Sequence, residues 1–387
     1  MSLTVGACGT VPQRDPLPDP DGELATIPGL SDHARFWGDV TSPETVEWLR
    51  TQTAQQMREV FPAAADGEVH FLAISGGGQH GAFGAGLLNG WTLSGSRPEF
   101  LIVTGVSTGA LIAPFAFLGP DYDQALKDLY TSRTTDDILK PRSLLQTITG
   151  DSAFDTSGLY ELIVEQVDDE MLRRLAREYK RGRMLMIGTT NLDARRPVTW
   201  NITAIAASDY PDKRNLIAKV LLASASMPGV FPPVLFDVVR DGQRYDELHV
   251  DGGATSQVFA YATDFDMAEL VSKLDADGRY TMSIIYNSRI RAMPRTVKPD
   301  IFNVAVASIL SLTHAQGVGD LFRIYKITRR DGGEYQLAFI PDEFERETEE
   351  LFDIDYMNDL YDLGFEMGRN GIPWSNKPPG SLETQGR

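Results

Sequence analysis

The chain of 387 residues has one cysteine, five histidines, a deficit of positive charge and no long apolar run. Its single cysteine, Cys8, excludes a disulfide within the chain. No segment approaches the roughly 18 to 20 unbroken apolar residues of a membrane-spanning helix. The 36 Lys and Arg residues against 54 Asp and Glu residues give a formal net charge of −18. This charge argues against nucleic acid as a partner, since phosphate binding needs clustered basic side chains.

The first 30 residues differ in composition from the rest. Cys8 follows the small residues Gly6 and Ala7 and precedes a stretch rich in Pro, Asp and Gly. This pattern resembles the end of a bacterial lipoprotein signal, so we expect Cys8 to be lipidated and the protein to be anchored in the cell envelope. The alternative is a chance cysteine in a cytoplasmic protein. We expect a lipoprotein-like N-terminus and flexible linker over 1–30, one folded domain over 31–374 and a disordered tail over 375–387.

Segments with the patterns of strands and helices alternate through the domain, which predicts an α/β layered core. Two apolar runs, 69–74 and 100–104, each lead into a glycine-rich turn and then into a helical segment. The second turn, 105–109, has the pattern G-x-S-x-G, which exposes a serine hydroxyl at the start of a helix.

Together the two turns predict acyl-transfer chemistry. The hydroxyl of Ser107 would become a nucleophile when a base takes its proton. The N–H of Thr108 would point to the oxygen of the carbonyl that reacts there. Gly76, Gly77 and Gly78 in the first turn lack Cβ atoms, so their N–H groups can approach the same oxygen and complete an oxyanion hole.

Two alternatives to this interpretation exist: the glycine loop could bind a dinucleotide, and the base could be a histidine. The loop also fits the dinucleotide pattern G-x-G-x-x-G, but the next predicted strand ends at Gly105 without the carboxylate that would hold a ribose. His249 and Asp251 are two residues apart on a predicted strand, so both point to the same side, and His80 lies in the glycine loop itself. Spacing alone leaves a Ser-His-Asp triad and a Ser-Asp pair open.

The ordered combination of three glycines at 76–78, the serine turn at 105–109 and Asp251-Gly252-Gly253 resembles the patatin-like phospholipases over most of residues 69–260. The resemblance implies a three-layer α/β/α fold around a mainly parallel central sheet. It also implies that Ser107 is the nucleophile, that Asp251 is the general base without a histidine, and that the three glycines form the oxyanion hole. No metal or cofactor is implied.

The implied activity is hydrolysis of phospholipids, lysophospholipids or neutral acyl esters at a membrane surface. The family often has Arg or Lys directly after the three glycines, whereas this chain has Gln79 and His80. That departure favours neutral esters or lysolipids. His80, His249 and Gly253 are further candidates for lining the site. The alternatives are a Ser-His-Asp esterase or peptidase and a non-catalytic lipid-binding lipoprotein.

Two other segments carry a functional and a structural interpretation. The stretch 171–183 is basic in an acidic chain, which indicates either a membrane-facing helix or, as charge runs usually do, a solvated helix face. Asn191 and Asp193 follow another predicted strand, where they would border the site or shape a turn. Phe115, Phe117, Phe231 and Phe236 are candidates for an acyl pocket, although aromatic side chains usually pack in the core.

Overall fold

The computed structural model describes residues 14–20, 22–64, 67–138, 140–141, 154–274, 279–294, 296–348 and 350–380; Cys8 lies outside these ranges. The strands are β1 (Arg35–Trp37), β2 (His70–Ile74), β3 (Ile102–Val106), β4 (Lys140–Pro141), β5 (Phe154–Asp155), β6 (Met184–Asn191), β7 (Arg196–Asn201), β8 (Val234–Arg240), β9 (Gln243–Asp251), β10 (Thr281–Tyr286) and β11 (Glu334–Phe339).

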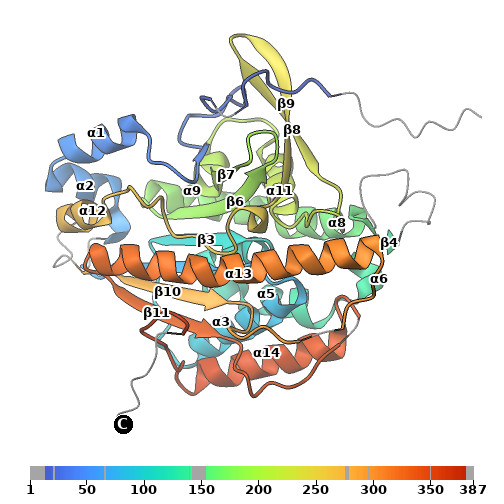
Figure 1. Ribbon diagram of the computed structural model, residues 1–387. Helices are drawn as coiled ribbons and strands as arrows, with labels where there is room; N and C mark the ends of the chain where they lie inside the picture. The colour runs from blue at the N-terminus through green and yellow to red at the C-terminus, as the bar shows by residue number, and fades with distance from the viewer. Residues whose placement is uncertain are drawn as a thin grey trace, which may run out of the picture.

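The helices cover both faces of the main sheet (Figure 1). They are α1 (Pro43–Thr51), α2 (Ala54–Val60), α3 (Gly81–Leu93), α4 (Thr108–Leu118), α5 (Asp123–Thr131), α6 (Thr135–Ile138), α8 (Ser157–Gln166), α9 (Asp169–Lys180), α10 (Ile202–Ala207), α11 (Lys213–Ser224), α12 (Met267–Lys273), α13 (Ile301–Arg330) and α14 (Ile354–Arg369). Within the described ranges, no helix combines the length and the apolar character needed to cross a membrane.

The main sheet has the strand order β1-β7-β6-β3-β2-β10-β11. Its centre, from β6 to β11, is parallel, whereas β7 and β1 continue it as antiparallel strands. The hairpin of β8 and β9 turns at Asp241 and Gly242, which both have positive φ, and it projects beyond the sheet in yellow (Figure 1). The last residues of β9 return to pair with the end of β6. This return brings a distant part of the chain to the carboxyl end of the central strands.

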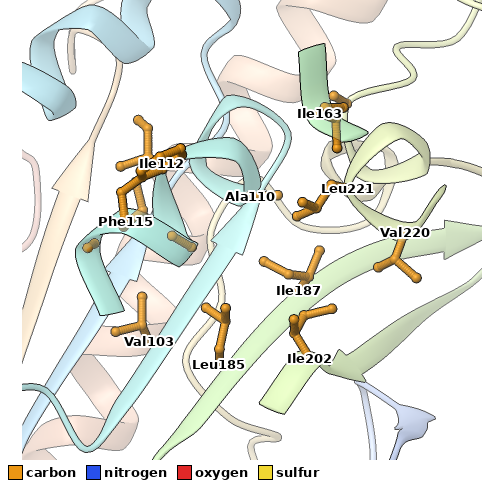
Figure 2. Packing of buried hydrophobic residues seen from close by; sticks show 14 of the residues in the cluster. Val103, Ala110, Ile112, Phe115, Ile163, Leu185, Ile187, Ile202, Val220 and Leu221 are labelled. Carbon is orange, nitrogen blue, oxygen red and sulfur yellow. The ribbon is translucent and has the colours of Figure 1, made fainter. Parts of the chain in front are cut away.

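Alternating side chains of the central strands build two separate cores. Leu72, Ile74 and Val103 point into a large cluster with α3, α4, α8, α11 and α14, and Figure 2 shows part of this cluster between α4, α11 and the sheet. Phe71 and Ala73 point the other way, into a smaller cluster with α2, α12 and the second half of α13. Helices therefore cover a mostly parallel sheet on both faces, and the expected three-layer α/β/α fold is confirmed.

The described part of the N-terminal region is packed rather than a free linker. Leu17, Ala25 and Ile27 are buried in the large core. Arg14 forms an ion pair of 2.6 Å with Asp193, and the chain pairs with the β8–β9 hairpin through Pro16 with Asp246 and Thr26 with Val239. The expectation of a linker up to residue 30 is therefore wrong for residues 14–20 and 22–30, because their apolar side chains have a core surface to cover.

The expected tail also begins later than residue 375. Ser375 exchanges two backbone hydrogen bonds of 2.9 Å with Leu337 of β11. Pro378 is buried, and the description ends at residue 380. Edge pairing with β11 thus orders the start of this segment.

Candidate active site

Ser107 sits at a strained turn between β3 and α4. Its φ of 55° and ψ of −127° are unusual for a residue with a side chain, and such conformations cost about 1–3 kcal/mol. The flanking glycines make the turn possible, because a Cβ on Gly105 would lie 2.4 Å from the oxygen of Gly109, and a Cβ on Gly109 would lie 2.3 Å from the oxygen of Ile74. The predicted strand-turn-helix context of the serine is confirmed.

Ser224 holds the backbone of Ser107 in place. The N–H of Ser107 donates to Ser224 Oγ at 3.0 Å, and that hydroxyl donates to the oxygen of Gly188 on β6 at 2.6 Å. Ser224 is fully buried at the end of α11. Its role was not predicted, since nothing in the local sequence indicates that α11 ends behind the serine turn.

Asp251 reaches Ser107 because β3 and β9 pair with successive parts of β6: β3 pairs with β6 up to Gly188, and β9 pairs with it from Thr189 onward. Gly188 of β6 pairs with Val106, and the next residue, Thr189, pairs with Asp251. The residue that follows Val106 therefore meets the residue that ends β9. The Ser107 hydroxyl donates a hydrogen bond to the Asp251 carboxylate, which also accepts the Gly253 N–H at 2.7 Å. The structure thus brings together the two residues that the resemblance implied.

Burial controls the proton affinity of Asp251, which is 6% exposed. The loss of solvent raises the pKa of its carboxyl from 3.8 to about 7, while the hydrogen bonds from Ser107 and Gly253 pull the pKa downward. Within the described ranges, no basic side chain contributes to this pKa. Asp251 is therefore poised to exchange a proton near neutral pH, which suits a general base.

The glycine loop after β2 lies directly beside Ser107. A Cβ on Gly76 would be 3.2 Å from the Cβ of Ser107, and a Cβ on Gly77 would be 2.2 Å from the oxygen of Asn287. The N–H of Gly76 already donates to the oxygen of Gln257 at 2.9 Å. Gly76 thus differs from the expectation of an oxyanion donor: it lacks a free N–H and serves close packing.

Three N–H groups remain for an oxyanion. Among the described residues, no protein acceptor is recorded for the N–H of Gly77, Gly78 or Thr108. Thr108 opens α4, so its N–H also lies at the positive end of the helix dipole. These three N–H groups could therefore donate hydrogen bonds to an oxygen that becomes negatively charged beside the Ser107 hydroxyl.

Buried polar residues that the sequence did not single out fix the loop. Asn287, just after β10, donates from Nδ2 to the oxygen of Ser75 at 3.0 Å and accepts the N–H of Gly84 at 3.1 Å. Asp320 of α13 accepts the N–H of Gln257 at 2.7 Å, and the oxygen of Gln257 in turn holds Gly76. Only the tertiary fold brings these segments together.

The histidines are not placed to act as the base. His249 is fully buried; its Nδ1 lies 2.9 Å from Thr189 Oγ1 and its Nε2 lies 3.1 Å from Glu247 Oε2. Burial lowers the pKa of His80 to about 4, with a further contribution from the nearby Arg289, and its ring packs against Tyr356. Burial also lowers the pKa of His249, against the opposing effect of Glu247. Neither imidazole forms a hydrogen bond with Ser107 or Asp251.

The remaining candidates have structural roles. Asn191 Oδ1 accepts the N–H of Ala194, as expected of a turn, and Asp193 pairs with Arg14. On α9, Arg173 and Arg174 form ion pairs with Glu170, which fits a solvated helix face.

An apolar pocket begins one helical turn after Ser107. Leu111 and Phe115 of α4 line it together with Leu159, Leu162 and Leu221. Residues four apart on a helix share a face, so Leu111 lies on the face of α4 that starts at Ser107. Of the four phenylalanines considered for an acyl pocket, Phe115 lies on this lining, whereas Phe117, Phe231 and Phe236 are buried in the large core outside it.

One of three comparisons with known proteins identifies a family for this chain. The family model described as patatin-like phospholipase matches residues 72–264. A crystal structure of VipD from Legionella pneumophila is similar with 11% identity and a TM-score of 0.33; the match covers 78% of this chain and 66% of VipD. No curated protein sequence matches the chain. The matched range of the family model contains the glycine loop, the strained serine turn and Asp251, and the chain belongs to the patatin-like phospholipase family of lipid acyl hydrolases.

Proposed function

We propose that this protein is a serine-dependent lipid acyl hydrolase in which Ser107 is the nucleophile and Asp251 the general base. One observation carries the proposal. The Ser107 hydroxyl donates to a buried carboxylate, and three N–H groups without a recorded protein acceptor stand at the same turn and in the loop beside it. A nucleophile, its base and an oxyanion hole are the minimum for acyl transfer.

The reaction follows from these contacts. Asp251 takes the proton of Ser107 as Oγ attacks the ester carbonyl carbon, and the N–H groups of Gly77, Gly78 and Thr108 receive the negative oxygen. The tetrahedral intermediate then expels the alcohol, which recovers the proton from Asp251. Asp251 next removes a proton from water, the hydroxide attacks the acyl-serine, and the carboxylic acid leaves as Ser107 regains its proton.

The surroundings favour an apolar acyl ester. The pocket one turn of α4 beyond Ser107 is lined mostly by apolar side chains, which is in keeping with the apolar part of an acyl ester. Next to the glycine loop, Gln79 and the neutral His80 replace a cation, so we propose lysolipids or neutral esters as preferred substrates over phospholipids with two chains. We further propose that lipidation at Cys8 holds the enzyme at a membrane of the cell envelope.

The test is the release of fatty acid from a phospholipid, a lysophospholipid and a monoacylglycerol by the purified chain. We expect Ser107→Ala to lower the rate on every substrate by more than about a thousandfold while the fold is retained. Ser94→Ala, at an exposed serine after α3, is the matched control and should keep full activity. Activity retained in Ser107→Ala would contradict the proposal.

A further inference from the structure

The first half of α13 is an apolar surface without a cover in the described structure. From Ile301 to Gly319 the sequence has no Asp, Glu, Lys or Arg. Among the residues whose exposure is described, none from Ile301 to Gln316 is buried, and Gly317 is the first that is. Ile301, Val304 and Leu312 are 93%, 47% and 70% exposed, and their spacing puts them on one face of the helix. Such a patch marks an interaction surface.

The charge beside this surface has the opposite sign to that of the chain. Between Asn287 and Gly319 the sequence has four basic residues and one acidic residue, a local net charge of +3 in a chain of −18. Arg291 and Lys298 are exposed in the segment that precedes α13, together with Met293 at 48% and Val297 at 42% exposure. Exposed apolar side chains mixed with basic ones are typical of an element that lies in the headgroup region of an anionic bilayer.

The same helix is connected to the candidate active site through Gln257. A Cβ on Gly317 would lie 3.2 Å from the Cβ of Gln257, and Asp320 binds the N–H of Gln257 at 2.7 Å. The oxygen of Gln257 holds Gly76, which packs on Ser107. Figure 1 shows α13 in orange as one long helix across the molecule. Its exposed half is thus a direct continuation of the half that contacts Gln257.

We propose that the exposed half of α13 and the basic segment before it dock on an anionic phospholipid surface and set the active site against it. The choice of lipid as the occupant rests on the proposed function; the existence of the surface does not. Lipid contact through α13 would place the glycine loop near the bilayer, so that an ester leaves the lipid layer close to Ser107. The interaction is separate from any anchor at Cys8.

The test is co-sedimentation of the non-acylated full chain carrying Ser107→Ala, which prevents hydrolysis of the vesicles. The vesicles are phosphatidylcholine alone, or phosphatidylcholine with about one third phosphatidylglycerol. The variant Val304→Glu/Leu312→Glu changes the α13 surface. The matched control is Val46→Glu/Leu93→Glu, which adds the same charge at residues of similar exposure, 40% and 61%, in α1 and α3. Hydrolysis of a short, soluble ester by the same variants with Ser107 intact tests the catalytic site separately.

We expect binding to the mixed vesicles that Val304→Glu/Leu312→Glu weakens by more than about tenfold and the control by less than about twofold. We expect Arg291→Gln/Lys298→Gln to weaken binding to the mixed vesicles only. Hydrolysis of the soluble ester should stay unchanged in both Glu variants.

Equal losses in the two Glu variants, or no loss in the α13 variant, would overturn the proposal. So would a dimer that the α13 substitutions dissociate without any vesicle binding, since a second copy would then be the occupant. Absent hydrolysis by the wild type would instead refute the proposed function and leave the binding result standing.

Discussion

Ionised Asp251 should cost the folded protein stability, and Asp251→Asn should remove that cost. The carboxyl is 6% exposed, and among the described residues the Ser107 hydroxyl and the Gly253 N–H are the hydrogen-bond donors that offset its desolvation. Asparagine is neutral at every pH and keeps an oxygen for Gly253. We therefore expect the variant to be inactive and, above neutral pH, more stable than the wild type.

The size of the effect follows from proton linkage. A rise of the pKa from 3.8 to about 7 corresponds to roughly 4 kcal/mol at about 1.36 kcal/mol per pKa unit. Between these two values the folded state holds the proton that the unfolded state releases, so the wild type loses stability as pH rises through this window. Below this window Asp251 is protonated in both the folded and the unfolded state, so its ionisation does not change the stability of the wild type. Above about pH 7 it is ionised in both states, and the full loss of roughly 4 kcal/mol is present.

The assay is urea unfolding of the wild type and Asp251→Asn at several pH values, with Ser107→Ala as the control. The free energy of unfolding of Asp251→Asn relative to wild type should increase by roughly 1.4 kcal/mol per pH unit between about pH 5 and about pH 7, and then level off. The difference for Ser107→Ala should follow this course far less, since it keeps the carboxyl. A difference for Asp251→Asn that is independent of pH would refute the reasoning, because the carboxyl would then not be held with a raised pKa.

Three further outcomes are expected. The kcat/KM of the wild type on a soluble ester should rise with pH through about 7 and stay high above it, because only the ionised Asp251 accepts a proton; a flat profile from about pH 5 to about pH 8 would argue against this base. His249→Gln should retain labelling of Ser107 by a fluorophosphonate within about tenfold, since its ring contacts Thr189 and Glu247; loss of about a thousandfold or more would favour a histidine triad. Asn287→Ala should lower kcat by about ten- to a hundredfold with little change in KM, because it loosens the glycine loop; an unchanged kcat would deny it this positioning role.

The local parts of the fold and site were predictable from sequence. The apolar runs before the glycine loop and the serine turn gave β2 and β3 within two residues. This worked because strand, turn and helix follow one another along the chain, so each signal lies within about fifteen residues. At positions 105 and 109 any residue larger than glycine would clash with nearby backbone atoms, and the G-x-S-x-G pattern indicates this requirement.

The parts that depend on distant segments were not predictable. Gly76 was expected to donate to an oxyanion, but its N–H is taken by Gln257, which the chain reaches only through β8 and β9. Helix α13 continues through Gly317 to Arg330 because this glycine packs on Tyr286, and nothing near Gly317 in the sequence indicates that contact. The hairpin of β8 and β9 did carry a usable signal in Asp241-Gly242, a pair typical of tight β-turns.

The choice between the two candidate bases also needed the fold. His249 and Asp251 are equivalent by alternation along the strand, and their distances from Ser107 depend on where β9 meets β6. The register places Asp251 opposite Thr189, directly beyond the end of β3, and leaves His249 two residue pairs further from it, opposite Asn191. No spacing within the sequence determines that register.

The most direct test of the central claim is covalent labelling with a fluorophosphonate, with the adduct mapped by mass spectrometry in wild type and in Asp251→Asn. The Ser107–Asp251 mechanism predicts one adduct, on Ser107, in the wild type and its loss in the variant, which should remain folded. No adduct on Ser107, or an undiminished adduct in Asp251→Asn, would contradict it.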